Sequence, residues 1–482
     1  MANIIRVFHP PFAIRYRLLY TRPMRRFIPI IAITLFAFLS AIPLFTNQTT
    51  CSDDGFFHIA KAVTLEQMIR DGQPFGRWSP EMAHGFGYPY FNYYAPLPSY
   101  ILIAIHSLGF IYPVALHIFF ALCIWIAGLA TYFFVRDWMN DAAGVAASVV
   151  YMTAPYLAFD ILFRSALAES FALVFPPLIL FFAHRSLSNF QLPTSNFHFW
   201  DLGFALSIAA LLYTHNITAL ITLPLIVGYV VLHTLINRNP RALIFNSLII
   251  ILGLSLAARF WLPALTERNL VQSDKLLVPP IFTYYTNYLS LNELLAQPSF
   301  IDPLIINPSP AKALGLVTAL LALIGFAAVI SNQWSVISKQ KSPISNLQSP
   351  TLGIWGLGFG IFFFIYSSLT LSFTQPLWDS VPLMPFIQFP WRLLGIASLC
   401  AAILSGAVVY WLPQRAWLLS GVVITVAALG NLSWWYPRYC SPFKEVTLAN
   451  TIQYEFDTFT LGTSAKGEFL PNTVKNFPQD DS

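Results

Sequence analysis

Charged residues are scarce in this chain, and only 10% of its 482 residues are Asp, Glu, Lys or Arg. A typical soluble domain carries about 25%, so the composition excludes an ordinary cytosolic enzyme. It also excludes a disordered protein, which has low hydrophobicity and high charge, and a nucleic-acid binder, which needs a basic surface. Cysteine is scarce as well, and four cysteines are too few for a disulfide scaffold.

Apolar residues dominate instead, at 56% of the chain with a mean hydropathy of +0.63. Apolar runs of about twenty residues recur from end to end, and each can cross a hydrocarbon core of about 30 Å. The sequence therefore predicts an all-α integral membrane protein with about eleven transmembrane helices, within a range of about 10–13. The expected spans are 27–46, 112–135, 141–158, 166–184, 200–215, 217–236, 242–262, 312–331, 352–373, 391–412 and 415–434.

The first apolar run is preceded by six arginines, as in a signal peptide, but it ends in FTNQTTCSDD without an A-x-A-like cleavage site. We interpret it as a retained span that follows a basic cytoplasmic N-terminus, 1–26. A shorter run, 97–109, is too short to span and predicts a juxtamembrane or re-entrant helix. If it did span, the count would become twelve and every later loop would change side.

The distribution of charge assigns a side to each loop. In the eleven-span arrangement the inside segments are rich in Arg and Lys, and their only acids are Asp137, Asp141 and Asp201. This is the pattern of the positive-inside rule, and it accounts for the net charge of +5 without nucleic acid. We expect a multi-pass protein of the cell (inner) membrane, with a cytoplasmic N-terminus and an extracytoplasmic C-terminus.

The expected membrane domain, 27–434, carries two long outer loops, 47–111 and 263–311. The tail, 435–482, is also predicted outside, and its stretch TLANTIQYEFDTFTLG alternates as one or two strands would. The tail ends in a polar PQDDS, which fits the start of a truncated soluble domain. Cys51 and Cys440 both fall at the outer rim, and the sequence leaves open whether they pair.

The sharpest polar motif, Cys51–His58, directly follows the first span. The adjacent carboxylates of Asp53 and Asp54, with His58 four residues after Asp54, predict a catalytic site. Paired carboxylates can hold a divalent cation such as Mg or Mn, or one can act as a general base. The alternative is structural, with Ser52 or Asp53 capping a helix over 54–70.

Four further features lie on the same outer side: the aromatic loop 84–96, the turn at 160–169, His215 and the start of the span 391–412. The aromatic loop 84–96 contains Tyr88 and Tyr94, which suit either an interfacial belt or stacking on sugar rings. Charged residues at this depth are costly and often functional. The candidate substrate-binding residues are Tyr88, Tyr94, Arg164, Glu169, His215 and Arg392.

Each charged or polar candidate also has a bland explanation. Arg164 could simply pair with Asp160 four residues earlier, which would leave Glu169 without an obvious local partner. His215 could be a satisfied rim histidine. Arg392 lies in the first turn of a helix opened by Pro390, where a cation needs a compensating anion. One interpretation is that this anion is a phosphate. The alternative is that the arginine side chain extends to the membrane interface.

These motifs resemble a known group. SDDGFFH, GYPYFNYYAPLPSYI, RSALAESFAL, THN, QFPWRLL and GEFLP are similar to bacterial membrane proteins known as 6-pyruvoyl-tetrahydropterin synthase-related, from about residue 27 to 472. An acidic motif in the first outer loop of a polytopic protein also resembles the GT-C glycosyltransferases. That superfamily includes protein O-mannosyltransferases, oligosaccharyltransferase catalytic subunits and lipid A aminoarabinose transferases.

The GT-C resemblance implies a polyprenyl-phosphate-linked sugar donor and an extracytoplasmic glycan, lipid or protein acceptor. It implies that Asp53 or Asp54 is the catalytic acid, and it makes Arg164 and Arg392 candidates for the donor phosphate. The alternatives from other classes are a transporter or flippase for a lipid-linked or anionic solute, and a non-catalytic membrane scaffold. Transporters usually place polar groups near the bilayer midplane, whereas here they gather at one surface.

Overall fold

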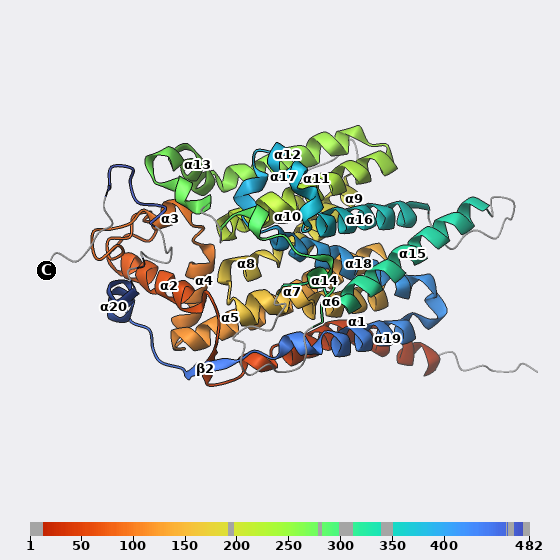
Figure 1. Ribbon diagram of the computed structural model, residues 1–482. Helices are drawn as coiled ribbons and strands as arrows, with labels where there is room; N and C mark the ends of the chain where they lie inside the picture. The colour runs from red at the N-terminus through yellow and green to blue at the C-terminus, as the bar shows by residue number, and fades with distance from the viewer. Residues whose placement is uncertain are drawn as a thin grey trace, which may run out of the picture.

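The computed structural model describes residues 13–190, 197–277, 282–297, 312–338, 350–458, 460 and 467–475. Long helices lie side by side along one axis, and a group of shorter elements gathers at one end (Figure 1). The long bundle consists of α1 (Ala13–Ser40), α5 (Tyr112–Trp138), α6 (Asp141–Met152), α8 (Leu167–Ala172), α9 (Phe175–Asn189), α10 (Phe199–Thr214), α11 (Asn216–Asn237), α12 (Pro240–Leu256), α15 (Leu316–Ser338), α16 (Pro350–Ser368), α18 (Leu394–Trp411) and α19 (Ala416–Gly430).

Shorter helices lie between the long helices and in the tail. They are α2 (Gly55–Arg70), α3 (Tyr90–Tyr93), α4 (Leu97–His106), α13 (Ala258–Thr266), α14 (Leu291–Leu294), α17 (Gln375–Ser380) and α20 (Leu448–Thr458). The expected short helix at 97–109 is α4, whose ten residues are too few to span.

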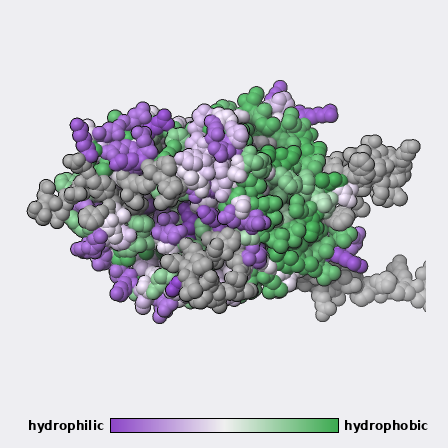
Figure 2. All heavy atoms as spheres, in the orientation of Figure 1, coloured by the Kyte–Doolittle hydropathy of each residue, from purple (hydrophilic) through white to green (hydrophobic). Residues whose placement is uncertain are grey.

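Each of the eleven expected spans contains a helix, so the all-α membrane architecture is confirmed. Within the described residues, four helices are long and apolar enough to cross a membrane, or up to six if each bent pair counts as one span. Figure 2 shows apolar residues in a broad band over the bundle, with hydrophilic residues at the end that carries α2, α13 and α20. The band is the surface that faces lipid.

Two spans that we expected to be continuous are broken, which corrects the predictions for 141–158 and 242–262. The first bends by 44° between α6 and α7 (Pro155–Ala158). Pro155 has no N–H and disfavours helical geometry at the preceding Ala154, so the helix stops there. The second bends by 71° between α12 and α13, where the indole of Trp261 donates a hydrogen bond to the carbonyl of Leu254.

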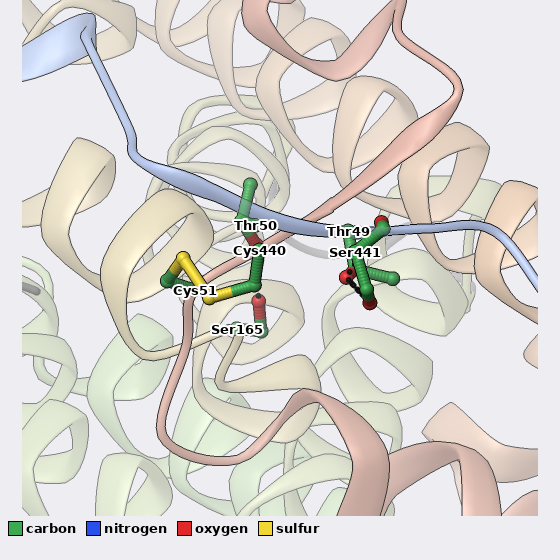
Figure 3. The surroundings of a disulfide bond; sticks show 6 residues. All are labelled: Thr49, Thr50, Cys51, Ser165, Cys440 and Ser441. Atoms are coloured by element: carbon green, nitrogen blue, oxygen red, sulfur yellow. Dashed lines mark hydrogen bonds between the residues drawn. A yellow bond between two sulfur atoms is a disulfide. The ribbon is translucent and has the colours of Figure 1, made fainter.

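A two-stranded antiparallel sheet joins the two ends of the membrane domain. β1 (Gln48–Thr50) pairs with β2 (Tyr439–Pro442). Cys51, directly after β1, and Cys440, within β2, form a disulfide with their Cα atoms 5.1 Å apart (Figure 3). The backbone N–H of Cys51 also donates to the carbonyl of Arg438. The pairing that the sequence left open is therefore made, and it ties the first outer loop to the tail.

The strands expected in TLANTIQYEFDTFTLG are wrong, because this stretch forms helix α20 through Thr458. Thr447 and Asn450 bond reciprocally at its start, and this N-terminal cap favours a helix. The aromatic ring of Tyr454 packs on Phe56 and Phe57 of α2, 4.5 and 5.8 Å between centroids. Burial against α2 thus outweighs the strand-like alternation.

Candidate functional site

The acidic motif is held against the loop that precedes α8. The backbone N–H groups of Asp53 and Asp54 donate to the carbonyls of Phe163 and Arg164 at 3.2 and 2.8 Å. Gly55 makes this approach feasible, because a Cβ there would lie 2.8 Å from Ser52 Oγ and 3.3 Å from Ser165 Cβ. The capping alternative is wrong: Asp54 occupies the N-cap position of α2, but no side chain caps the helix. The Asp54 carboxylate lies 3.6 Å from the guanidinium of Arg164 instead.

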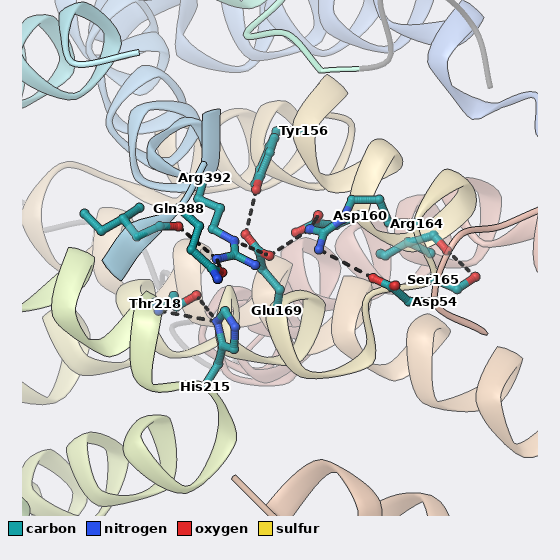
Figure 4. A network of polar contacts seen from close by, with 12 residues as sticks. Asp54, Tyr156, Asp160, Arg164, Ser165, Glu169, His215, Thr218, Gln388 and Arg392 are labelled. Atoms are coloured by element: carbon teal, nitrogen blue, oxygen red, sulfur yellow. Dashed lines mark hydrogen bonds and ion pairs between the residues drawn. The ribbon is translucent and has the colours of Figure 1, made fainter. Parts of the chain in front are cut away.

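Arg164 is the centre of a buried ionic network (Figure 4). One guanidinium nitrogen donates to Asp160 at 2.8 Å and to Glu169 at 2.7 Å. Glu169 also accepts a hydrogen bond from the Tyr156 hydroxyl at 2.6 Å. The expectation that Glu169 lacks a local partner is therefore wrong, since it is the most heavily bonded carboxylate of the network.

Arg392 approaches the same carboxylate from the start of the span that ends at Tyr410. Its Nε lies 3.3 Å from Glu169, and another guanidinium nitrogen donates to the carbonyl of Ile387 and to Gln388. Pro390 opens the short helix that precedes α18, as expected. The compensating anion that Arg392 requires is therefore supplied by the protein itself.

Backbone strain occurs beside both arginines. Ser165, directly after Arg164, has φ +51°, and Gln388, four residues before Arg392, has φ +65°. Left-handed backbone is unfavourable for residues other than glycine and concentrates at functional sites. Both guanidinium groups are thus positioned by strained turns.

The three carboxylates near Arg164 differ sharply in exposure. The side chains of Asp160 and Glu169 are 0% and 3% exposed, whereas that of Asp54 is 37% exposed. The buried pair neutralises the arginines, because an unpaired charge at this depth is very costly. Asp54 remains accessible to a substrate.

His58 and Tyr94 lie together one turn further along. His58 is buried, and its ring lies 6.4 Å from that of Tyr94. Burial lowers the pKa of His58 well below its usual value, and the nearby cations Lys61 and Arg164 lower it further. At neutral pH this imidazole is therefore uncharged, which suits a hydrogen-bond partner.

The structure places the other two predicted residues differently. His215 accepts hydrogen bonds from Thr218 at the start of α11, so it caps that helix while facing the network (Figure 4). Tyr88 is fully buried, and its hydroxyl accepts a hydrogen bond from the N–H of Phe469. Tyr88 therefore belongs to the packing of the outer loop, whereas Tyr94 belongs to the site.

Lys61 is a site residue that the sequence analysis missed. It lies on α2, seven residues after Asp54, and its ammonium nitrogen sits 4.0 Å from the ring centroid of Tyr94. Burial lowers the pKa of Lys61 to about 7, while Asp54 and Glu468 act in the opposite direction. The signal was present, because positions 54, 58 and 61 share one helix face and a lone lysine interrupts an apolar stretch.

Lys312 is the second residue that was missed, at the end of the long outer loop whose residues 298–311 lie outside those described. Its ammonium lies 5.3 Å from the ring centroid of Trp391, and Arg164 lies 5.0 Å from that same ring. Burial lowers the pKa of Lys312, and the negative charges of Glu293 and Asp53 oppose that effect. Lys61 and Lys312 thus lie within electrostatic reach of Asp54 and Asp53, respectively.

A resident metal ion has few ligands available here. Within the described part of the chain, no group of three or more His, Cys, Asp and Glu side chains converges on a point that could hold a metal. A cation at Asp53 and Asp54 would take its other oxygens from water and substrate, which is the usual mode of Mg²⁺.

Three solved structures match this chain over most of its length. An arabinofuranosyltransferase, AftD from Mycobacteria, matches with a TM-score of 0.50 and 15% identity over 84% of this chain and 26% of its own. ArnT from Cupriavidus metallidurans, bound to undecaprenyl phosphate, matches with a TM-score of 0.46 and 13% identity over 83% of this chain and 63% of its own. The oligosaccharyltransferase of Archaeoglobus fulgidus matches with a TM-score of 0.47 and 11% identity over 94% of this chain and 62% of its own.

At the level of sequence, a relative from Lactococcus lactis subsp. cremoris (strain MG1363), itself uncharacterized, is 22% identical over 249 residues. The match covers 49% of this chain and only 39% of that protein. Residues 91–439, well over half of the chain, match the family described as "6-pyruvoyl-tetrahydropterin synthase related domain; membrane protein". This stretch holds Tyr94, the buried network residues Asp160, Arg164, Glu169 and Arg392, and Lys312, whereas Asp54, His58 and Lys61 precede it. The chain belongs to the 6-pyruvoyl-tetrahydropterin synthase-related family of membrane proteins.

Proposed function

We propose that the protein is a membrane glycosyltransferase that uses a polyprenyl-phosphate-linked sugar and transfers it to an extracytoplasmic glycan, lipid or protein. One observation carries the proposal. An accessible carboxylate, Asp54, lies at one end of an apolar bundle, with two lysines within electrostatic reach of the acidic pair and a neutralised arginine pair behind it. The fold shared with an arabinofuranosyltransferase is compatible with this activity.

The donor phosphate is assigned to the two lysines. Arg164 and Arg392 direct their guanidinium groups at Glu169 and Asp160, so both cations are already compensated. Lys61 and Lys312 instead lie over the rings of Tyr94 and Trp391 beside the acidic pair. In this proposal Arg164 and Arg392 contribute positive potential from behind, and the lysines contact the phosphate.

The chemistry is a single displacement. Asp54 takes the proton of the acceptor hydroxyl as its oxygen forms a bond to the anomeric carbon. The bond from that carbon to the phosphate oxygen breaks with its electron pair, and polyprenyl phosphate leaves with the added negative charge. Lys61 and Lys312 stabilise that charge, and the configuration at the anomeric carbon inverts.

The expected divalent cation stays a prediction. Asp53 and Asp54 would hold it, and when bound it would polarise the acceptor hydroxyl or the phosphate. The displacement described above involves only side chains of the protein and not this cation.

The disulfide supports the proposed orientation in the membrane. Disulfides persist in oxidising compartments and are rare in the cytosol, and Cys51–Cys440 lies at the end that holds the site. We therefore assign that end to the extracytoplasmic side, with a cytoplasmic N-terminus and an extracytoplasmic tail.

The test is donor consumption by the purified full chain in detergent. The protein is incubated with total polyprenyl-phosphate-linked sugars of its host, with and without EDTA, and loss of lipid-linked sugar is followed by mass spectrometry. Asp54→Asn is compared with Asp71→Asn, a matched control directly after the C-terminal end of the same helix.

We expect wild type and Asp71→Asn to consume donor and Asp54→Asn to lose at least about a hundredfold in rate, the scale of a lost general base. Equal consumption by all three proteins, or consumption by none, would overturn the proposal. Inhibition by EDTA would show that the cation is required.

A further inference from the structure

The GEFLP motif, residues 467–471, folds back onto the first outer loop. Phe469 packs among Tyr88, Tyr90 and Tyr93, with ring centroids 5.9, 6.0 and 5.1 Å away. Its backbone N–H donates to the Tyr88 hydroxyl at 2.9 Å. The tail is therefore fixed against the same tyrosine cluster that contacts Lys61.

The other side of this segment is held by the second outer loop. The N–H of Gln272 donates to the carbonyl of Leu470 at 3.0 Å, and the N–H of Asn472 donates to the carbonyl of Leu270 at 2.9 Å. The Gln272 side chain adds bonds to the carbonyls of Pro471 and Val474. Glu468 thus stands at a defined position between the two loops, next to Phe469.

Lys61 needs a negative partner at this place. It is 5% exposed, and its ammonium nitrogen lies 4.0 Å from the ring centroid of Tyr94 and 5.2 Å from that of Tyr90. Burying an ammonium without compensation costs several kcal/mol, and aromatic faces repay only part of that cost.

The four charged and titratable groups that act on Lys61 come from three parts of the chain: α2, the tail and the turn before α11. Two attract its positive charge: Asp54 at the start of α2 and Glu468 in the tail. His58 on α2 and His215 before α11 also lie within electrostatic reach, and each would repel Lys61 if protonated. Asp54 also forms an ion pair with Arg164. Glu468 directly precedes Phe469, whose ring packs on Tyr90, and the Lys61 ammonium lies over that same Tyr90 ring.

We propose that Glu468 is a positioning residue of the site, whose carboxylate keeps Lys61 charged and aimed at the anionic group of the substrate. The inference rests on the proposed function for the role of Lys61, but the coupling of the two side chains is independent of it. The GEFLP segment is then a part of the site rather than a covering over it.

The experiment compares three variants of the full chain in detergent. Glu468→Gln removes the charge at constant size, and Glu468→Asp keeps the charge on a shorter side chain. Glu455→Gln is the control, because Glu455 is another tail carboxylate that contacts the first outer loop, at His84. Labelling of Lys61 by an amine reagent at pH 6 is quantified by mass spectrometry, since only the neutral amine reacts.

In Glu468→Gln the pKa of Lys61 falls, so more of the amine is neutral at a given pH. A fall of about one unit raises labelling at pH 6 about fivefold and weakens binding of a polyprenyl phosphate at pH 6.5 about threefold. At pH 5 Lys61 is protonated in every variant, and binding becomes equal again. Labelling in Glu468→Asp should fall between that of wild type and that of Glu468→Gln, because the charge is kept but lies farther from Lys61. Labelling in Glu455→Gln should match wild type.

Wild-type labelling of Lys61 in both Glu468 variants would overturn the inference. A larger change in labelling in Glu468→Asp than in Glu468→Gln would also overturn it, because side-chain size rather than charge would then be responsible. If Glu468→Gln does not fold, Glu468→Asp decides alone: its labelling must exceed wild type by a measurable factor. Labelling needs no sugar transfer, so it separates this inference from the Asp54→Asn test. Altered labelling with unchanged phosphate binding would keep the coupling and remove Lys61 from the donor site.

Discussion

Glu169 is the residue that holds the ionic network together. Its 3%-exposed carboxylate accepts hydrogen bonds from Arg164 and Tyr156 and pairs with Arg392. Glu169→Gln leaves two buried guanidinium groups with less negative charge, and breaking a buried pair costs about 3–5 kcal/mol. We expect thermal unfolding in detergent to show a loss of this size.

A surface ion pair provides the comparison. Arg70 is 67% exposed and pairs with Glu66 on one face of α2. Arg70→Gln should change stability by less than about 0.5 kcal/mol, as exposed pairs do. A similar small effect for Glu169→Gln would show that the network contributes little to the folded state.

At the scale of elements, the contact between α15 and α18 depends on one glycine. A Cβ at Gly325 would lie 2.0 Å from the carbonyl oxygen of Leu404 on α18, and a backbone atom cannot rotate away. Gly325→Ala therefore forces the two helices apart, at a cost of about 1–3 kcal/mol as for other overpacked sites. The melting temperature of the purified variant measures it.

Gly421 in α19 is the matched control, since a Cβ there would meet nothing within 4 Å. Gly421→Ala should leave stability unchanged or raise it by up to about 1 kcal/mol, because alanine favours a helix. If both alanine variants behaved alike, the close approach of α15 and α18 would not be a determinant of the fold.

For the whole molecule, the Cys51–Cys440 disulfide joins residues separated by 389 positions and sits at the end that holds the site. Replacing both cysteines by serine should cost about 2–5 kcal/mol, the range for native disulfides. In intact cells, a membrane-impermeant maleimide should label these two cysteines only after an impermeant reductant is added outside.

The buried thiols of Cys123 and Cys400 serve as internal controls, and they should stay unlabelled until the protein is denatured. Labelling of Cys51 or Cys440 without reductant would contradict the disulfide. Labelling only after the cells are permeabilised would place this end of the molecule in the cytoplasm and reverse the proposed orientation.

The sequence predicted the membrane class and the helical architecture, since both follow from additive local properties. Apolar run length, scarcity of charge and a shared-face spacing such as Asp54 to His58 can be read without knowing any contact. The α20 helix was missed because its outcome depends on a cap at Thr447 and on burial of Tyr454 against α2.

The tertiary structure alone decided what each charge does. Glu169 and Arg392 are 223 positions apart, and the sequence cannot tell that one neutralises the other. It likewise cannot join Cys51 to Cys440. Electrostatic roles depend on distance and burial, and for residues far apart in the chain both are set only when the helices pack.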